Sequence, residues 1–174
     1  SLIAVFPNRR LCWFIARLGV RLLVTLTATP LTVHGRKNLP KETPCILVAN
    51  HASYLDGLLM TLTIPIDYSF VAKAELQNNV FARIFLSRLG TEFVERFDIQ
   101  KGIADARRMA NYAGRDRSLL IFPEGTLYRM PGLHEFHMGA FTAAVEANIP
   151  VIPITVRGTR SKLRDTSLFP RRGP

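Results

Sequence analysis

Short apolar runs alternate with helix-like segments along most of this chain, and this alternation constrains its fold more than any other feature. The runs are five to seven residues long and rich in Ile, Val, Leu and Phe, while the segments between them repeat apolar residues at helical spacing. Such an order predicts an α/β fold, a three-layer sandwich with a mainly parallel or mixed central sheet. The expected strands are 31–35, 45–49, 68–73, 91–97, 118–122 and 150–156, and the expected helices are 54–63, 79–89, 99–113 and 138–147.

The size of the chain suits one such domain. Of its 174 residues 48% are hydrophobic, so a core can form without disulfides or a structural metal. Cys12 and Cys45 follow no bridge or ligand spacing, and the four histidines have no partners at zinc-site intervals, so no metal site is expected. We place the domain at residues 31–174 and expect it to be truncated at its C-terminus, because the chain stops in a turn-like Arg-Arg-Gly-Pro sequence.

The net charge of +10 resides at the two ends of the chain. Residues 1–41 hold seven Lys and Arg and no acid, residues 157–174 hold six and one, and the remaining residues hold ten and twelve. A nucleic-acid binder would carry its basic residues on the face that contacts the nucleic acid, interleaved with aromatic residues. The middle of the chain has no such pattern, so we expect no nucleic-acid partner.

The first 30 residues are expected to form an amphipathic helix. Residues 11–29 are almost wholly apolar, but Arg17 and Arg21 interrupt them and form a narrow stripe with Arg10 and Thr25. Two arginines near the centre of a membrane-spanning helix would cost about 2.5–3.5 kcal/mol each, which argues against a simple span. Two alternatives remain: a helix that lies in the membrane interface, or one that packs on the protein's own core.

An imidazole precedes a carboxylate by five residues where strand 45–49 is expected to end. With Ser53 as N-cap and Asp56 at the third helical position, His51 lies just outside the helix and its ring can fold back toward the carboxylate. One ring nitrogen would donate to Asp56, and the other would be free to take a proton. The alternative is a plain capping box formed by Ser53 and Asp56.

A second candidate element follows strand 118–122. This strand runs into Pro123-Glu124-Gly125-Thr126 at its carboxyl end, where open α/β sheets present ligands. Gly125 permits a positive φ that lets backbone amides approach an anion. The alternative is an ordinary strand exit.

Two cations are candidates for binding a phosphate. Arg96 has a planar guanidinium that suits a phosphate monoester if it faces the same side as His51. Lys73, near the end of strand 68–73, is a candidate for the same task. The alternative for Arg96 is a solvated cation paired with a neighbouring acid.

These elements together resemble the glycerolipid acyltransferase family, especially the lysophosphatidate acyltransferases. The resemblance rests on four blocks in the family's order and at its intervals: His51-x4-Asp56, Phe93-Val94-Glu95-Arg96, Phe122-Pro123-Glu124-Gly125-Thr126 and Val151-Ile152-Pro153-Ile154. It implies that His51 and Asp56 are catalytic, that Arg96, Glu124, Gly125 and Thr126 serve the phosphate-bearing acceptor together with Lys73, and that the fourth block lines the acyl-donor region. It also implies an N-terminal membrane-docking helix.

Two positions depart from the family's pattern. Family members often have Arg directly after the Glu-Gly-Thr block, where this chain has Leu127-Tyr128 before Arg129, and they often carry Lys around Phe136, where this chain reads Glu135-Phe136-His137. Both departures remove cations near the acceptor, so they affect the expected headgroup more than the expected reaction.

The expected activity is acyl transfer from acyl-CoA or acyl-carrier protein to the hydroxyl of a lysophospholipid, most directly 1-acylglycerol-3-phosphate, in phospholipid biosynthesis. Neutral His51 would act as general base without any cofactor, and the enzyme would be peripheral or monotopic at the cytoplasmic face of a membrane. No Gly-x-Ser-x-Gly elbow is present, so direct attack is expected rather than an acyl-enzyme. The alternatives are a lipid hydrolase that uses Ser53 as nucleophile, and a non-catalytic module that binds membrane surfaces.

Overall fold

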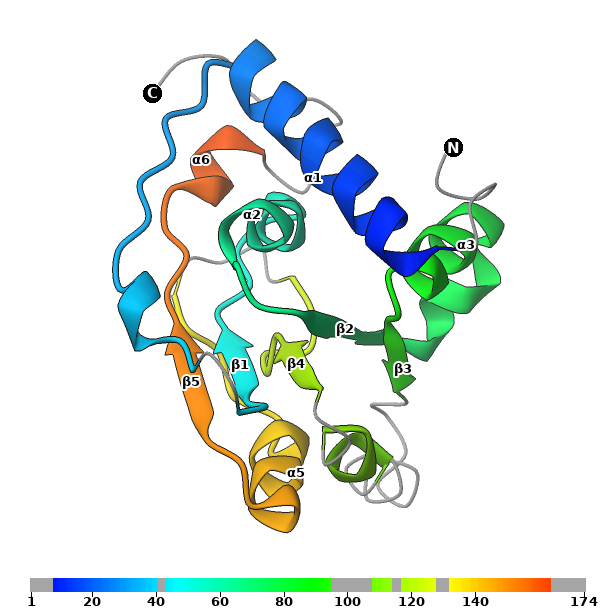
Figure 1. Cartoon of the computed structure of the whole chain (residues 1–174). Coiled ribbons are helices and arrows are strands. Elements are labelled where there is room, and N and C mark those ends of the chain that lie inside the picture. Colours follow the sequence, from blue (N-terminus) through cyan, green and yellow to red (C-terminus); the bar gives the residue numbers. More distant parts are fainter. Residues whose placement is uncertain (1–7, 41–42, 95–107, 114–116, 128–131, 164–174) are drawn as a thin grey trace.

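The central sheet has five parallel strands in the order β3-β2-β4-β1-β5 (Figure 1). This computed structural model describes residues 8–40, 43–94, 108–113, 117–127 and 132–163. The strands are β1 (Ile46–Ala49), β2 (Tyr68–Lys73), β3 (Glu92–Val94), β4 (Ser118–Ile121) and β5 (Val151–Ile154). The helices are α1 (Arg9–Leu26), α2 (Leu55–Thr63), α3 (Val80–Arg88), α5 (Gly139–Ala147) and α6 (Thr159–Lys162), with 3-10 turns at Arg36–Asn38 and Ala74–Asn78.

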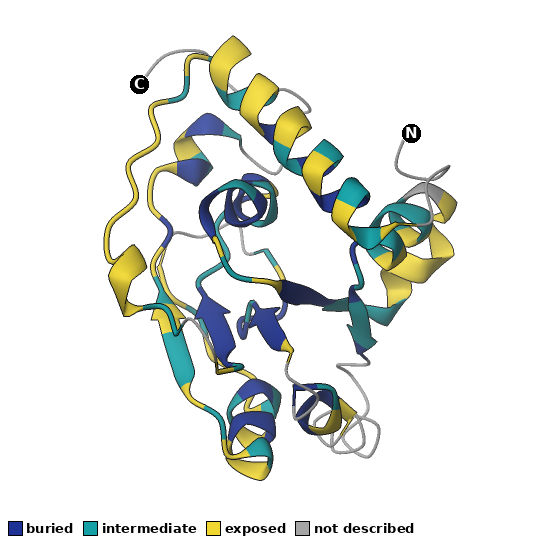
Figure 2. Ribbon diagram, in the orientation of Figure 1, coloured by how far each residue is buried: buried dark blue, intermediate teal, exposed yellow. Residues whose placement is uncertain are grey.

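Helices cover both faces of this sheet, which confirms the predicted three-layer α/β sandwich. Figure 1 shows α1 and α2 on one side of the sheet and α5, with the helical residues 108–113, on the other. Strands β1 and β4 are buried along their whole length (Figure 2). Because side chains alternate along a strand, Leu47 packs into the core beneath α1 and α2, whereas Ile46 and Val48 pack into the core beneath α5.

Helix α1 packs on the domain through one face and exposes apolar residues on the other. Cys12, Trp13, Ala16 and Val20 are buried against the core. A row at four-residue spacing is exposed, with fractional exposures of 64% for Phe14, 47% for Leu18, 53% for Leu22 and 72% for Leu26. Burial therefore alternates along the helix in Figure 2. No helix in the described part of the chain is long and apolar enough to cross a membrane.

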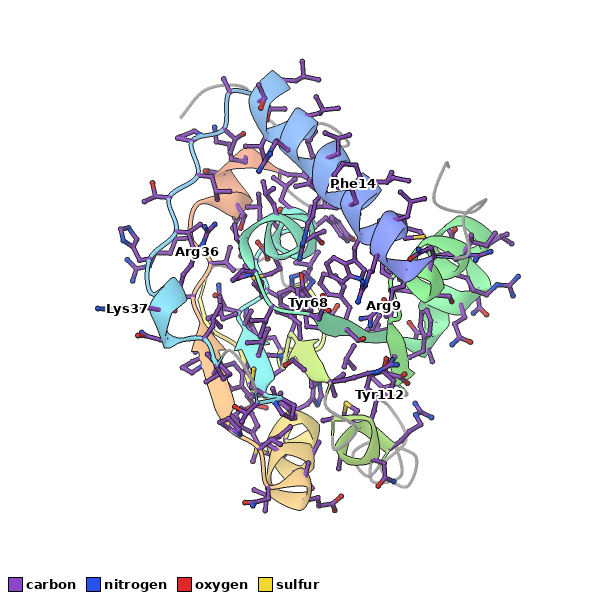
Figure 3. The ribbon with its side chains drawn as sticks, in the orientation of Figure 1. Arg9, Phe14, Arg36, Lys37, Tyr68 and Tyr112 are labelled. Carbon is purple, nitrogen blue, oxygen red and sulfur yellow. The ribbon has the colours of Figure 1, made fainter. Side chains whose placement is uncertain are left out.

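Two arginines of α1 turn toward the domain. Arg9 donates from Nη2 to the Tyr68 carbonyl at 2.8 Å, and Figure 3 shows it reaching toward β2. Arg17 donates from Nε to the Thr61 carbonyl at 3.2 Å and stacks on the Trp13 ring. The predicted stripe of Arg10, Arg17 and Arg21 keeps its helical spacing in α1, and within it backbone carbonyls of the domain draw the Arg17 side chain inward.

Three further positions bear on the fold. The predicted strand at 31–35 is wrong, because these residues are exposed and join no ladder. Pro153 lies on the edge strand β5, where its missing N–H costs no ladder bond. Gly90 ends the helix predicted before it, with φ of 78°, and a Cβ there would lie 3.0 Å from Nε of Arg9.

The sheet order creates a crevice where β1 and β4 end. From β1 the chain crosses to β2 by way of α2, whereas after β4 it reaches β5 by way of α5 on the opposite face. These neighbouring strands thus send their connections in opposite directions, and ligands bind at such switch points in open α/β sheets. His51 follows β1 and Glu124 follows β4, so the fold brings both to this crevice.

Candidate active site

His51 and Asp56 form the pair that the sequence predicted. Nδ1 of His51 donates to Oδ2 of Asp56 at 3.1 Å. Asp56 is fully buried, while the His51 side chain is 19% exposed. The same Oδ2 accepts the backbone N–H groups of Ala52 at 2.7 Å and Ser53 at 2.8 Å. A carboxylate held in this way fixes the tautomer in which Nε2 of His51 is the proton acceptor.

The His51–Asp56 pair coexists with one half of the predicted capping box. Oδ2 of Asp56 accepts the N–H of Ser53, whereas Oγ of Ser53 accepts the N–H of Leu55 at 3.2 Å rather than that of Asp56. Helix α2 begins at Leu55, one residue later than predicted, so that Tyr54 and not Ser53 is its N-cap residue. Oγ of Ser53 also donates to the Leu163 carbonyl at 2.9 Å, and its side chain is buried. Its hydroxyl is thus bound to backbone on both sides.

Glu124 lies at the crevice but faces the backbone. Its side chain is 2% exposed. Oε1 accepts the N–H of His51 at 2.8 Å, and Oε2 accepts the N–H of His134 at 3.3 Å. The residue before the Pro-Glu-Gly turn also contacts the catalytic pair, because the Phe122 ring stacks on the His51 imidazole with centroids 4.1 Å apart.

The turn after β4 has the conformation that the sequence predicted. Gly125 has φ of 78°, and its N–H donates to the Phe122 carbonyl at 3.0 Å. Thr126 is exposed beside the groove described below.

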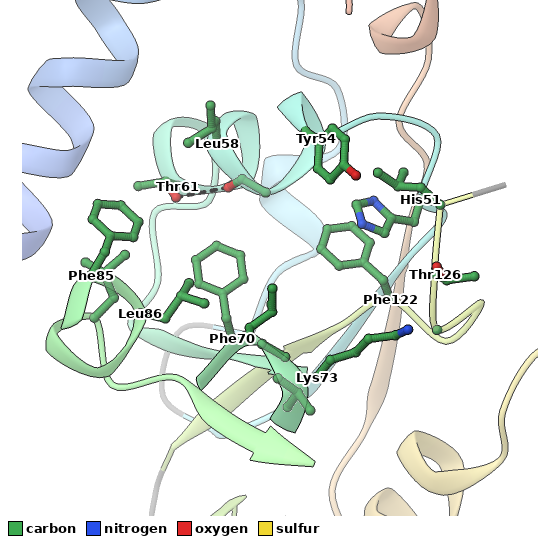
Figure 4. A pocket seen from close by; sticks show the side chains of 17 residues that line it. His51, Tyr54, Leu58, Thr61, Phe70, Lys73, Phe85, Leu86, Phe122 and Thr126 are labelled. Carbon is green, nitrogen blue, oxygen red and sulfur yellow. Dashed lines mark hydrogen bonds between the residues drawn. The ribbon is translucent and has the colours of Figure 1, made fainter. Parts of the chain in front are cut away.

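Lys73 lies at the same edge of the sheet. Its partly exposed ammonium is 3.8 Å from a carboxylate oxygen of Glu75, and Figure 4 shows the side chain extending toward Phe122 and Thr126. Lys73 is in register with Val94 of the neighbouring strand. Arg96, two residues further along, lies outside the described residues, so its place in the site stays a prediction.

An apolar groove of about 650 Å³ opens beside His51. Figure 4 shows Phe85 and Leu86 of α3 at the end away from His51, with Phe70 of β2 and Leu58 of α2 between them. Polar side chains gather near His51: Thr126 and Lys73 line the groove there. The arrangement can hold a long apolar chain with its polar end at the imidazole.

Sequence reasoning missed the lining of this groove and two contacts around the catalytic pair. The apolar face of helix 79–89 was recognised as a pattern, but nothing local indicated that it would face His51. The Phe122 ring stack was not anticipated either. Asn50 was also missed: its amide accepts the N–H of Val156 at 2.7 Å and donates to the Val156 carbonyl at 3.0 Å. Its only sequence signal was its position directly before His51.

Comparisons with known proteins show the family of this chain. The family model described as acyltransferase matches residues 30–157. The 1-acyl-sn-glycerol-3-phosphate acyltransferase BAT2 of Brassica napus chloroplasts is 33% identical over 73% of this chain and 37% of its own length. The lyso-ornithine lipid O-acyltransferase of Pseudomonas aeruginosa is 32% identical over 88% of this chain and 55% of its own length.

The fold has a counterpart among solved structures. The crystal structure of PlsC from Thermotoga maritima, a 1-acyl-sn-glycerophosphate acyltransferase, matches with a TM-score of 0.76 and 21% identity, covering 95% of this chain and 66% of PlsC. The chain thus spans between 37% and 66% of the lengths of these three proteins.

Proposed function

This chain belongs to the acyltransferase family, and we propose that it transfers a fatty acyl group from an acyl thioester to the free hydroxyl of a lysophospholipid. The preferred acceptor is 1-acylglycerol-3-phosphate, the donor is acyl-CoA or acyl-carrier protein, and no cofactor takes part. The observation that carries the proposal is the His51–Asp56 pair at the mouth of an apolar groove. A base with its orienting carboxylate, next to a site for an acyl chain, is what such a transfer requires.

In the proposed reaction, Nε2 of His51 removes the proton of the acceptor hydroxyl as the oxygen attacks the thioester carbonyl. An ester C–O bond forms, the C–S bond breaks, and the imidazolium returns its proton to the departing thiolate. Asp56 stabilises the imidazolium without becoming protonated. Its bonds to Ala52 and Ser53 support this role, because they hold the carboxylate in place while the charge on the ring changes.

Acceptor binding is assigned to the polar end of the groove. Lys73 supplies a positive charge there, and Thr126 with the Gly125 turn supplies a hydroxyl and a close backbone approach. Arg96 stays in the proposed set as the guanidinium that would hold a phosphate. The relative from Pseudomonas aeruginosa is named for a lyso-ornithine lipid, an acceptor with a different headgroup. The test therefore includes acceptors with and without a phosphate.

The acyl chain is assigned to the groove itself. Its volume lies within the range usual for ligand cavities, about 300–1,000 Å³. Burying a chain there contributes about 0.8 kcal/mol per methylene.

Membrane association is assigned to α1. Its exposed row of Phe14, Leu18, Leu22 and Leu26 offers an apolar strip, and the exposed Arg10 and Arg21 offer charges for anionic headgroups. The enzyme is thereby peripheral or monotopic; its location at the cytoplasmic face stays a prediction.

Thiol release from acyl-CoA and acyl-carrier protein, measured in detergent with a panel of acceptors, tests the proposal. The panel contains lysophosphatidate, lyso-ornithine lipid, lysophosphatidylcholine and glycerol 3-phosphate. We expect acceptor-dependent thiol release, and a decrease of at least about 10²–10⁴-fold in His51→Ala, since a positioned base is worth that much. His34→Ala, which removes an exposed histidine, is the matched control.

Two results would contradict the proposal. Thioester consumption that needs no acceptor would indicate a hydrolase. Liposome binding without any thioester consumption would indicate a non-catalytic module.

A further inference from the structure

Three consecutive backbone N–H groups at the catalytic histidine all donate to buried carboxylates. The N–H of His51 donates to Glu124, and those of Ala52 and Ser53 donate to Asp56. These residues lie between the end of β1 and the start of α2, where neither a strand ladder nor a helix supplies acceptors. The two carboxylates therefore set the path of the chain through His51.

Glu124 is screened from the groove. Phe122, Gly125 and Thr126 line the groove, whereas the side chain of Glu124 lies behind them with 2% of its surface exposed. A ligand in the groove cannot reach this carboxylate without displacing the turn. A phosphate would in addition be repelled by its negative charge.

We propose that Glu124 is a positioning residue that acts through His51, rather than a contact of the acceptor. The inference rests on the proposed function for its kinetic test. Glu124 comes from the end of β4 and fixes the backbone of His51 at the end of the neighbouring strand β1, while Asp56 and Phe122 fix the ring. Its second oxygen ties the same turn to His134. Displacing a catalytic group by about 1 Å can cost about 100-fold in rate.

Glu124→Gln removes one of the two hydrogen bonds that the carboxylate accepts, at nearly constant side-chain volume. The amide oxygen can still accept one N–H, but the NH₂ group meets the second N–H donor and cannot accept from it. The hydrogen bond that remains also loses the extra strength that a charged acceptor gives it. The backbone of His51 should shift, although the acceptor-binding groups stay where they are.

The experiment separates positioning from acceptor binding through kcat and the acceptor KM. For Glu124→Gln we expect kcat to fall by about tenfold or more, with the acceptor KM unchanged, and equally with lysophosphatidate and with the phosphate-free lyso-ornithine lipid. Glu146→Gln, the same charge change at an exposed position of α5, is the matched control and should retain the wild-type rate. A rise in the KM for lysophosphatidate alone, with kcat unchanged, would overturn the proposal.

A double-mutant cycle tests whether Glu124 acts through His51. In the His51→Ala background, Glu124→Gln should lower the residual rate no further, because the group it positions is already absent. If the two substitutions instead lower the rate by independent factors that multiply in the double variant, the proposal is overturned.

A third readout does not depend on catalysis. In the amide NMR spectrum, the N–H protons of His51 and His134 should exchange more slowly than those of exposed loops in the wild type, and at least one of them should exchange faster in Glu124→Gln. Unchanged exchange at both residues would overturn the proposal. If the wild type transfers no acyl group, the proposed function fails, while this measurement still decides the role of Glu124.

Discussion

One carboxylate oxygen of Asp56 accepts hydrogen bonds both from the backbone before helix α2 and from the His51 imidazole. Oδ2 accepts from the His51 ring and from the N–H groups of Ala52 and Ser53. The hydrogen bonds from the backbone therefore place the carboxylate where it can also contact the imidazole. Both interactions depend on the order of residues in one short junction. Among the described residues, the Ser53 hydroxyl bonds only backbone groups: it accepts the N–H of Leu55 at the start of α2 and donates to the Leu163 carbonyl.

Replacing Ser53 with alanine separates transfer from hydrolysis. We expect Ser53→Ala to lose about 1 kcal/mol of folding free energy, because a helix-capping hydroxyl is worth about that much, and to retain acyl transfer within a few-fold. Denaturant unfolding and thiol release measure the two effects. A decrease in thioester consumption as large as that of His51→Ala would identify Ser53 as a nucleophile and contradict the proposed mechanism.

The buried thiol of Cys45 should be unreactive. Burial raises the pKa of Cys45, although its hydrogen bond to Ser118 acts in the opposite direction. Because only the thiolate reacts, a thiol reagent at pH 8 should leave Cys45 unmodified in the folded protein and label it after unfolding. The unfolded chain ionises first as the pH rises, so this thiol favours unfolding above its ordinary pKa of about 8.5. Rapid labelling of the folded protein at pH 8 would contradict the prediction.

Helix α1 packs on the protein's own core, which is one of the two alternatives that its sequence left open; the membrane interface stays a proposal. One face packs on the core through Trp13 and its neighbours, and the opposite face exposes leucines at four-residue spacing. A helix with two apolar faces can bury the second face only against another apolar surface. The first surface is the domain, and the second is the membrane in our proposal.

A charged residue introduced into the exposed apolar row of α1 tests the proposed contact of this helix with a membrane. Leu22→Glu should reduce binding to anionic liposomes by about tenfold, because it removes an apolar contact and adds a charge repelled by anionic headgroups. The free energy of unfolding should change little, since Leu22 is 53% exposed. Sedimentation with liposomes measures the binding.

The matched control for this change is Val145→Glu. Val145 is exposed on α5, which lies on the other side of the sheet from α1 (Figure 1). Equal losses in both variants would show that liposome binding follows net charge and not the surface of α1.

At the scale of the whole molecule, the sheet order positions the site. Because β1 and β4 are neighbours that send their connections to opposite faces, His51 and Glu124 meet although 73 residues separate them. The same topology lets α2 and α3 both line the groove, with Phe85 and Leu86 at the end away from His51. The length of the groove is thus a property of the assembled layers.

Filling the far end of the groove should shorten the preferred acyl chain. Leu86→Trp adds volume at the end away from His51, so we expect the rate with the longest thioesters to fall about tenfold or more, and the rate with short ones to persist. Thiol release across a series of acyl lengths measures the change. Val80→Trp, at an exposed position of α3 outside the groove, is the control. A uniform loss at all lengths would contradict the assignment of the groove to the acyl chain.

Local sequence determined most of the described elements and the His51–Asp56 contact. Strand β2 was predicted to the residue, and the His51–Asp56 contact followed from five residues at one strand-to-helix junction, because both depend on periodicity and caps within a short window. The same reasoning failed at 31–35, where an extended pattern found no partner strand, and it did not anticipate that carbonyls of Thr61 and Ile64 draw the Arg17 side chain inward.

Tertiary structure alone decided the contacts of Glu124, the ring stack of Phe122 and the extent of the groove. Each depends on groups far apart in sequence that meet only through the strand order β3-β2-β4-β1-β5. Local periodicity carries no information on which strands become neighbours, because that choice is made by packing of the whole core. The carboxylate in the turn after β4 was therefore expected to contact the acceptor, whereas in the fold it accepts the backbone N–H groups of His51 and His134.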